Sequence, residues 1–155
     1  MQRDWKIKNL KEELSSCPQI KILDSQDDIE KFSKDFYDYS PVLIEIFKSC
    51  YADLVVRPES IEAIVAIAKS CKKNSIPLTI RGSGTGNYGQ CVPLKGGVVM
   101  LMGGIRKIRS FCPETGSITV ETGCLLRDLE IALNKKGRQL RLMPSTWRSA
   151  SIGGF

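Results

Sequence analysis

The residues with the clearest chemical potential lie in one loop, TIRGSGTGNYGQC, at residues 79–91. Four of the eight residues from Gly82 to Gly89 are glycine, and the loop follows an apolar run. Glycine loses more backbone freedom on folding than other residues, so such a cluster usually provides positive φ angles or lets another group come close to the backbone. The cluster therefore predicts either a tight turn or a nest of N–H groups that binds an anion.

Polar side chains in the same loop favour phosphate as that anion. Ser83, Thr85 and Asn87 carry short hydrogen-bond donors, and Arg81 adds a fixed positive charge where the preceding strand should end. A second segment rich in small donors, MPSTWRSASIGGF at residues 143–155, offers another point of attachment for a long diphosphate ligand. The alternative is that the glycine-rich stretch is a long structural turn.

Residues 84–89 also fit the dinucleotide-binding pattern GxGxxG, but their surroundings do not. That pattern must open a helix whose N-terminus meets the pyrophosphate, whereas residues 90–97, QCVPLKGG, contain a proline and two glycines that a helix cannot carry. Basic residues at 106, 107 and 109 stand where a ribose-binding acid is expected. No Gly-Lys-Ser/Thr follows the glycines, which excludes a P-loop.

The elements that would position the loop form a βαβ unit. Residues 54–56 are a short apolar run stopped by Pro58, and residues 76–80 start a second strand. Between the strands, Ser60 is the expected N-cap of a helix. Helical spacing predicts a buried face made of Ile61, Ile64, Val65, Ala68 and Cys71. Parallel strands would place the loop at the carboxyl edge of the sheet, where ligands bind in open α/β sheets.

Further along the chain, the pattern predicts a third strand at residues 97–102, a half-buried strand at residues 117–122 and a helix at residues 125–136. Residues 1–50 have the pattern of a polar, helical lead-in. We therefore predict an α+β fold. Residues 51–155 should form a small parallel βαβ subdomain followed by the start of a second, incomplete α+β subdomain.

The composition limits the classes of function. A chain of 155 residues can bury the core of one domain, and no apolar run reaches the ~18–20 residues of a membrane span. Six scattered cysteines without a CxxC pair, no histidine and no secretory signal disfavour a zinc site and predict buried thiols in a cytoplasmic protein. The net charge is +6, but the basic stretch at residues 135–148 suits a solvated helix end. We expect no nucleic-acid partner.

Four segments taken together resemble a known family. The segments ADLVVRPES, IPLTIRGSGTGNYGQCVPLKGGVVMLM, ITVETG and PSTWRSASIGG occur in this order between Ala52 and Phe155. They resemble the FAD-binding domain of the FAD-linked oxidases, the vanillyl-alcohol-oxidase or p-cresol-methylhydroxylase (PCMH) type that includes D-lactate and glycolate dehydrogenases. The glycine-rich loop and the later S-I-G-G form a fairly specific pair, whereas either motif alone would be weak.

The resemblance implies an FAD held between two subdomains, with the glycine-rich loop around its pyrophosphate and the C-terminal segment along its ribityl chain and pyrophosphate. The cofactor-binding residues that it implies are Arg81, Gly82, Ser83, Gly84, Thr85, Gly86, Asn87, Tyr88, Pro144, Ser145, Thr146, Ser151, Ile152, Gly153 and Gly154. Many members attach FAD through a histidine at the position of Thr85, but this chain has no histidine. Cys91 has no lysine or arginine beside it in sequence to lower its pKa, so we expect non-covalent FAD.

The resemblance also implies the activity, in which FAD accepts a hydride from a 2-hydroxy acid or an alcohol. FAD and a small hydroxy acid are therefore the expected partners. In the family, the flavin domain continues beyond S-I-G-G and a substrate-binding domain follows, so we expect residues 1–155 to be an N-terminal fragment, inactive alone, and we assign no catalytic residue. Two alternatives remain: a flavin reductase of the same fold, and a non-catalytic module that binds a nucleotide or nucleic acid.

Overall fold

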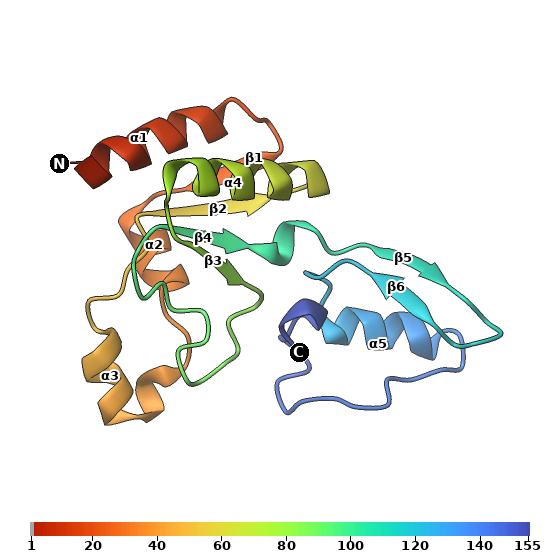
Figure 1. The fold of residues 1–155 in the computed structure, drawn as a ribbon. Coiled ribbons are helices and arrows are strands. Elements are labelled where there is room, and N and C mark those ends of the chain that lie inside the picture. The colour runs from red at the N-terminus through yellow and green to blue at the C-terminus, as the bar shows by residue number, and fades with distance from the viewer. Residues whose placement is uncertain (1) are drawn as a thin grey trace.

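The computed structural model describes residues 2–155, which contain a four-stranded sheet and a two-stranded sheet (Figure 1). We call the part built on the first sheet, residues 2–104, the sheet half, and residues 105–155 the hairpin half. The strands of the larger sheet lie in the order β1 (Ile20–Leu23), β2 (Leu54–Pro58), β4 (Val98–Leu101) and β3 (Leu78–Arg81). β1 is antiparallel to β2, whereas β2, β4 and β3 are parallel.

The predicted βαβ unit is confirmed as β2, α4 (Ile61–Asn74) and β3, and the predicted third strand is β4. β4 lies between the other two, so Val98 pairs with both Leu54 and Leu78. All four residues of β4 are buried, as expected of a parallel strand whose sheet is covered on both faces. This order leaves β3 at the sheet edge, and β3 ends directly before the glycine loop, which we define as residues 82–90.

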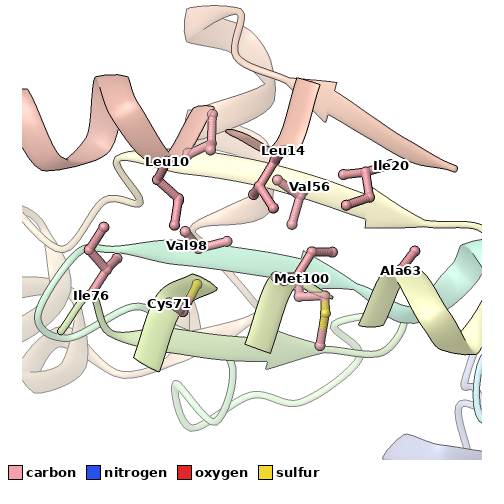
Figure 2. Packing of buried hydrophobic residues seen from close by; sticks show 11 residues of the cluster. Leu10, Leu14, Ile20, Val56, Ala63, Cys71, Ile76, Val98 and Met100 are labelled. Atoms are coloured by element: carbon pink, nitrogen blue, oxygen red, sulfur yellow. The ribbon is translucent and has the colours of Figure 1, made fainter. Parts of the chain in front are cut away.

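Helices cover the two faces of the larger sheet. Figure 1 shows α1 and α4 over one face and α2 on the other. In Figure 2, Leu14 of α1 points toward Val56 and Leu10 toward Val98, within a cluster that also contains α4 side chains. On the opposite face, Phe32 packs against a second cluster, which contains Val55 and Val99. The helices besides α4 in this half are α1 (Gln2–Ser15), α2 (Gln26–Phe32), α3 (Pro41–Phe47) and the 3-10 turns η1 (Tyr37–Tyr39) and η2 (Met102–Gly104).

The predicted helical lead-in over residues 1–50 is wrong in one respect, because it contains a strand. β1 pairs with β2 over four residues, from Ile20 opposite Pro58 to Leu23 opposite Val55. The lead-in also contributes Leu10 and Leu14 to the main core, at 0% and 2% exposure. A four-residue strand within a polar stretch gives too little alternation to be recognised in sequence.

The predicted buried face of α4 is also wrong in part. Ser60 caps the helix as expected, and its hydroxyl accepts a hydrogen bond from the N–H of Ala63 at 3.1 Å. The buried residues of the helix, however, are Ala63, Ile67, Ser70 and Cys71. Ile61 and Val65 are 55% and 43% exposed, and Ala68 is exposed. The helix thus packs Ile67 and three small side chains toward the sheet, and leaves Ile61 and Val65 exposed.

The hairpin half consists of a two-stranded antiparallel sheet and one helix. The predicted strand at residues 117–122 is β6 (Ile118–Val120), and it pairs with β5 (Ile108–Phe111), which was not predicted. The predicted helix at residues 125–136 is α5 (Leu126–Asn134). Its Leu129 and Leu133 form a small core with Cys124, under the two strands. No helix of residues 2–155 is both long and apolar enough to cross a membrane.

Candidate functional site

The glycine loop begins where β3 ends and requires a left-handed backbone at two glycines. Gly84 and Gly89 have φ angles of +71° and +80°, which side chains other than glycine rarely adopt. Within residues 2–155, the backbone N–H groups of Gly84, Thr85, Gly86 and Asn87 donate to no protein acceptor. Successive free N–H groups around a left-handed residue are the elements of an anion-binding nest.

The side chain of Arg81 anchors the glycine loop through contacts with residues outside the loop. The side chain is buried at 8% exposure, and its Nη1 donates hydrogen bonds to the carbonyl oxygens of Phe32 at 3.3 Å and Lys34 at 2.6 Å. A third contact joins the same nitrogen to Sγ of Cys91 at 3.0 Å. A side chain at Gly84 would overlap the guanidinium. The arginine therefore ties the start of the glycine loop to the segment after α2 and to the residue at the loop's far end.

Further contacts fix the middle and the end of the loop. The N–H of Phe36 donates to the carbonyl oxygen of Gly86 at 2.9 Å. Oε1 of Gln90 accepts from the N–H of Tyr88 at 3.0 Å, and the ring of Phe47 lies where a side chain at Gly89 would stand. The loop conformation thus depends on Phe36, between α2 and α3, and on Phe47, at the end of α3, as well as on β3.

The C-terminal segment is held by the hairpin half and reaches the glycine loop. The N–H groups of Ile152 and Gly153 donate to the carbonyl oxygens of Cys124 at 2.8 Å and Thr122 at 2.9 Å. A Cβ atom on Gly82 would lie 2.5 Å from Oγ of Ser151. Glycine at position 82 is therefore what allows the two predicted binding segments to meet.

Three cavities lie along this junction. The loop cavity, of about 180 Å³, is lined by residues 82–86, Gln90 and Cys91 from one side and by Ser151 and Gly154 from the other. The outer cavity is lined by Phe36, Thr85, Asn87, Ser145 and Thr146. The third, which we call the arginine cavity, is lined by residues that include Arg57, Arg81, Gly82, Ser83, Arg106 and Ser151. Both predicted segments therefore contribute to shared cavities.

Some residues implied by the resemblance lie outside these three cavities. Tyr88 is 71% exposed and lines none of them. Pro144 and Gly153 do not line them either, and Ile152 packs instead against the small core of the hairpin half. Arg81 lines the arginine cavity, but its Nη1 is engaged by protein carbonyl groups.

Sequence reasoning missed other residues that line the cavities. Gln90 was overlooked because it follows the glycines, although it lines the loop cavity. Phe36 lines the outer cavity from the connection between α2 and α3, which had no recognisable pattern. Arg57 could have been found, because it lies at the carboxyl end of a predicted strand, the edge at which ligands bind in such sheets. Arg106 was noticed only as a basic residue that argued against a dinucleotide motif.

The cysteine beside the loop is poorly suited to act as a nucleophile. Burial raises the pKa of the Cys91 thiol, the nearby Arg81 guanidinium lowers it by less, and Asp35 raises it further. The arginine was not visible as a neighbour in sequence, because ten residues separate it from the cysteine. All six cysteines are free thiols, and no group of three or more potential metal ligands occurs in the described part of the chain.

Comparisons with known proteins identify the family to which this chain belongs. The sequence model of the FAD binding domain family matches residues 52–155. Glycolate oxidase subunit GlcD of Bacillus subtilis is 31% identical over 102 residues, which are 66% of this chain and 22% of that protein. D-lactate dehydrogenase of Anaerostipes hadrus is 29% identical over 117 residues, 76% of this chain and 24% of that protein. The chain therefore spans less than a quarter of the length of these relatives.

Solved structures share the fold at low sequence identity. Alkyldihydroxyacetonephosphate synthase superposes with a TM-score of 0.80 at 20% identity, over 95% of this chain and 30% of that chain. 4-Ethylphenol oxidase from Gulosibacter chungangensis gives a TM-score of 0.76 at 19% identity, over 96% of this chain and 28% of that chain. The predicted α+β fold of the PCMH type is confirmed. The resemblance noted in the sequence is confirmed as well, and the chain belongs to the FAD binding domain family.

Proposed function

We propose that this chain binds FAD non-covalently at the junction of its two halves. The observation that carries the proposal is the loop cavity, because the glycine loop and Ser151–Gly154 line it together. The residues there suit a dinucleotide. The free N–H groups of residues 84–87 are donors for phosphate oxygens, and Oγ of Ser151 is buried without a hydrogen-bond partner in residues 2–155.

The chain's residues have distinct roles in this proposal. Gly84–Asn87 bind the pyrophosphate through the backbone, and Gly82 allows the C-terminal segment to approach. Ser145 and Thr146 face Asn87 across the outer cavity and supply short donors to the part of FAD that extends there. Arg81 acts by position, because it holds the loop in the conformation that exposes its N–H groups.

The attachment is non-covalent in this proposal because no suitable nucleophile is available. The chain contains no histidine. Attack by cysteine requires a thiolate, and burial keeps the pKa of Cys91 above its ordinary value. Acid precipitation of the holoprotein should therefore leave the flavin in the supernatant, and yellow colour that remains with denatured protein would contradict this part of the proposal.

We further propose that the whole protein is an oxidoreductase that oxidises a 2-hydroxy acid or an alcohol. Support comes from the relatives, which are named as a glycolate oxidase subunit and a D-lactate dehydrogenase. Bound FAD supplies the hydride acceptor for such a reaction. The residues of this chain bind and orient the cofactor and limit its contact with water.

A paired substitution tests the proposed cofactor site. Gly84→Val should force the Arg81 guanidinium and the loop backbone out of place, because a side chain at Gly84 overlaps that guanidinium, and weaken FAD binding by at least about tenfold, measured by quenching of flavin fluorescence. Gly116→Val is the matched control, because Gly116 has the same φ of +71° but nothing within 4 Å of its Cβ position. If folded Gly84→Val protein binds FAD as tightly as Gly116→Val protein, the glycine loop is a structural turn and the proposal fails.

A further inference from the structure

The arginine cavity shares lining residues with the loop cavity, but Arg57 and Arg106, which also line it, lie outside the two segments that the resemblance identified. Its volume is about 260 Å³. Arg57 and Leu101 contribute to it from the carboxyl ends of β2 and β4, and Arg106 from the segment after η2. Gly82, Ser83 and Ser151 line both this cavity and the loop cavity. A single elongated ligand can therefore extend from one into the other.

Two residues that line this cavity each carry a buried polar atom without a hydrogen-bond partner within residues 2–155. These atoms are Oγ of Ser151, in a residue that is 3% exposed, and Nε of Arg57. Buried polar atoms in folded proteins nearly always have a partner, and each exception calls for an explanation. Both atoms can donate a hydrogen bond, and a ligand in the cavity that accepts hydrogen bonds would supply the partner that the Ser151 hydroxyl lacks.

The positive charge of the arginines that line the cavity favours an anion as that ligand. Arg57, Arg81 and Arg106 line it, and no carboxylate does. Arg106 makes no ion pair or hydrogen bond with any other described residue. The Arg57 guanidinium lies 3.6 Å from Oε1 of Glu59, but that oxygen is closer to Nζ of Lys21, at 2.9 Å.

We propose that the arginine cavity is a second phosphate subsite, in which Arg57, Arg106 and the Ser151 hydroxyl bind a phosphate of the dinucleotide. The inference rests on the proposed function. It adds two arginine side chains to the backbone N–H groups that bind the diphosphate of FAD. The backbone nest in the loop cavity and the arginines in the adjoining cavity divide the diphosphate between them. Arg81, whose Nη1 is engaged by protein carbonyl groups, positions the loop and is not the main phosphate ligand.

Charge substitutions in the purified protein test the subsite. Arg106→Gln and Arg57→Gln should each weaken FAD binding by about tenfold, the size expected for the loss of a charge-assisted hydrogen bond. Both should also reduce the dependence of the FAD dissociation constant on salt concentration. Lys107→Gln is the matched control, because it removes the same charge beside Arg106 from a side chain that lines none of the three cavities. It should change FAD binding by less than about twofold.

Titrations with riboflavin and D-lactate separate the possible sources of the anion. Riboflavin has no phosphate, so its affinity should be the same in wild type and in all three variants. The subsite is wrong if the arginine variants bind FAD like Lys107→Gln, or if they lose riboflavin affinity to the same extent. Unchanged FAD affinity with weakened D-lactate binding would also overturn it and identify a carboxylate site instead. A wild-type protein that binds no FAD would overturn the proposed function itself, and this inference with it.

Discussion

The two halves that meet at the proposed cofactor site differ in the size of their sheets and of their buried cores. The sheet half buries a parallel sheet between helices, and Val55, Val56, Val98 and Val99 are all at 0% exposure. The hairpin half has two strands of four and three residues and a core of three buried side chains. Two-stranded sheets are marginally stable by themselves. The glycine loop is thus attached to the half with the larger core, and Ser151–Gly154 to the half with the smaller core. We expect the half with the smaller core to be the less stable of the two.

This difference has a consequence for binding. A ligand that contacts both halves must restrain the hairpin half against the sheet half, so part of its binding free energy is used for ordering. We therefore expect core substitutions in the sheet half to change global stability. Substitutions in the hairpin half should change FAD affinity more than global stability.

The largest effect is expected from the main core. Ile67→Ala should lower the free energy of unfolding by about 2–5 kcal/mol, because Ile67 is fully buried under the sheet. Leu129→Ala, in the hairpin half, should lower the global value by less and raise the FAD dissociation constant. Urea denaturation followed by circular dichroism gives the first quantity. Ile61→Ala, on the exposed side of α4, is the control and should stay within about 0.5 kcal/mol. Equal global losses for Ile67→Ala and Leu129→Ala would contradict the comparison.

The next effect concerns the connection between the sheet half and the glycine loop. Arg81→Gln removes charged hydrogen bonds to the carbonyl oxygens of Phe32 and Lys34, and should cost about 2 kcal/mol of local stability. Amide hydrogen exchange of residues 82–90, followed by mass spectrometry, should become faster while exchange of β2 and β4 is unchanged. Exchange in the loop at the wild-type rate would show that Arg81 does not hold it.

A smaller effect is expected from the ends of the helices. Ser60→Ala should cost about 1 kcal/mol, because it removes the side-chain cap of α4. Ser16→Ala is the control and should leave stability within about 0.5 kcal/mol, because Ser16 is exposed and its hydroxyl donates to the carbonyl oxygen of Glu13 instead of capping a helix N-terminus. Thermal unfolding of both variants checks the contrast. A stability for Ser60→Ala equal to that of wild type would mean that packing alone fixes the start of α4.

The smallest effect is expected at alkaline pH. Burial raises the pKa of the Cys71 thiol from 9.0 to about 11. The unfolded chain then loses this proton first as the pH rises, so the stability associated with the neutral thiol is complete below about pH 9 and declines toward about pH 11. The expected loss at about pH 9.5 is less than about 1 kcal/mol. Cys71→Ala should remove this part of the pH dependence in urea titrations, and an unchanged slope would contradict the assignment.

Sequence reasoning succeeded where local pattern and backbone chemistry agree. The β2–α4–β3 unit has apolar strands, a serine cap and helical spacing, and each signal acts within a few residues. The alternation of residues 117–122 was likewise enough to find β6. Strand β1 was missed because pairing with β2, which lies over thirty residues away, makes it a strand. The buried face of α4 was predicted wrongly because the prediction assigned the large aliphatic side chains Ile61 and Val65 to the core. The structure instead places Ala63 against the sheet, and the spacing of apolar residues does not reveal this choice.

The candidate site shows the same limit. The glycines and small polar residues were visible because each requires or permits a particular local backbone. The role of Arg81 depends on carbonyl groups almost fifty residues away, and Arg57 and Arg106 become neighbours only when two strands and a turn converge on one cavity. Charges brought together by topology leave no local signature in the chain.

The central claim is that one FAD is held jointly by the glycine loop and the C-terminal segment. Hydrogen exchange with and without saturating FAD tests it most directly. The account predicts slower exchange on binding in both residues 82–90 and residues 144–154, with little change in β2 and β4, which are already protected. Protection of only one segment, or of neither while FAD is bound, would contradict the account.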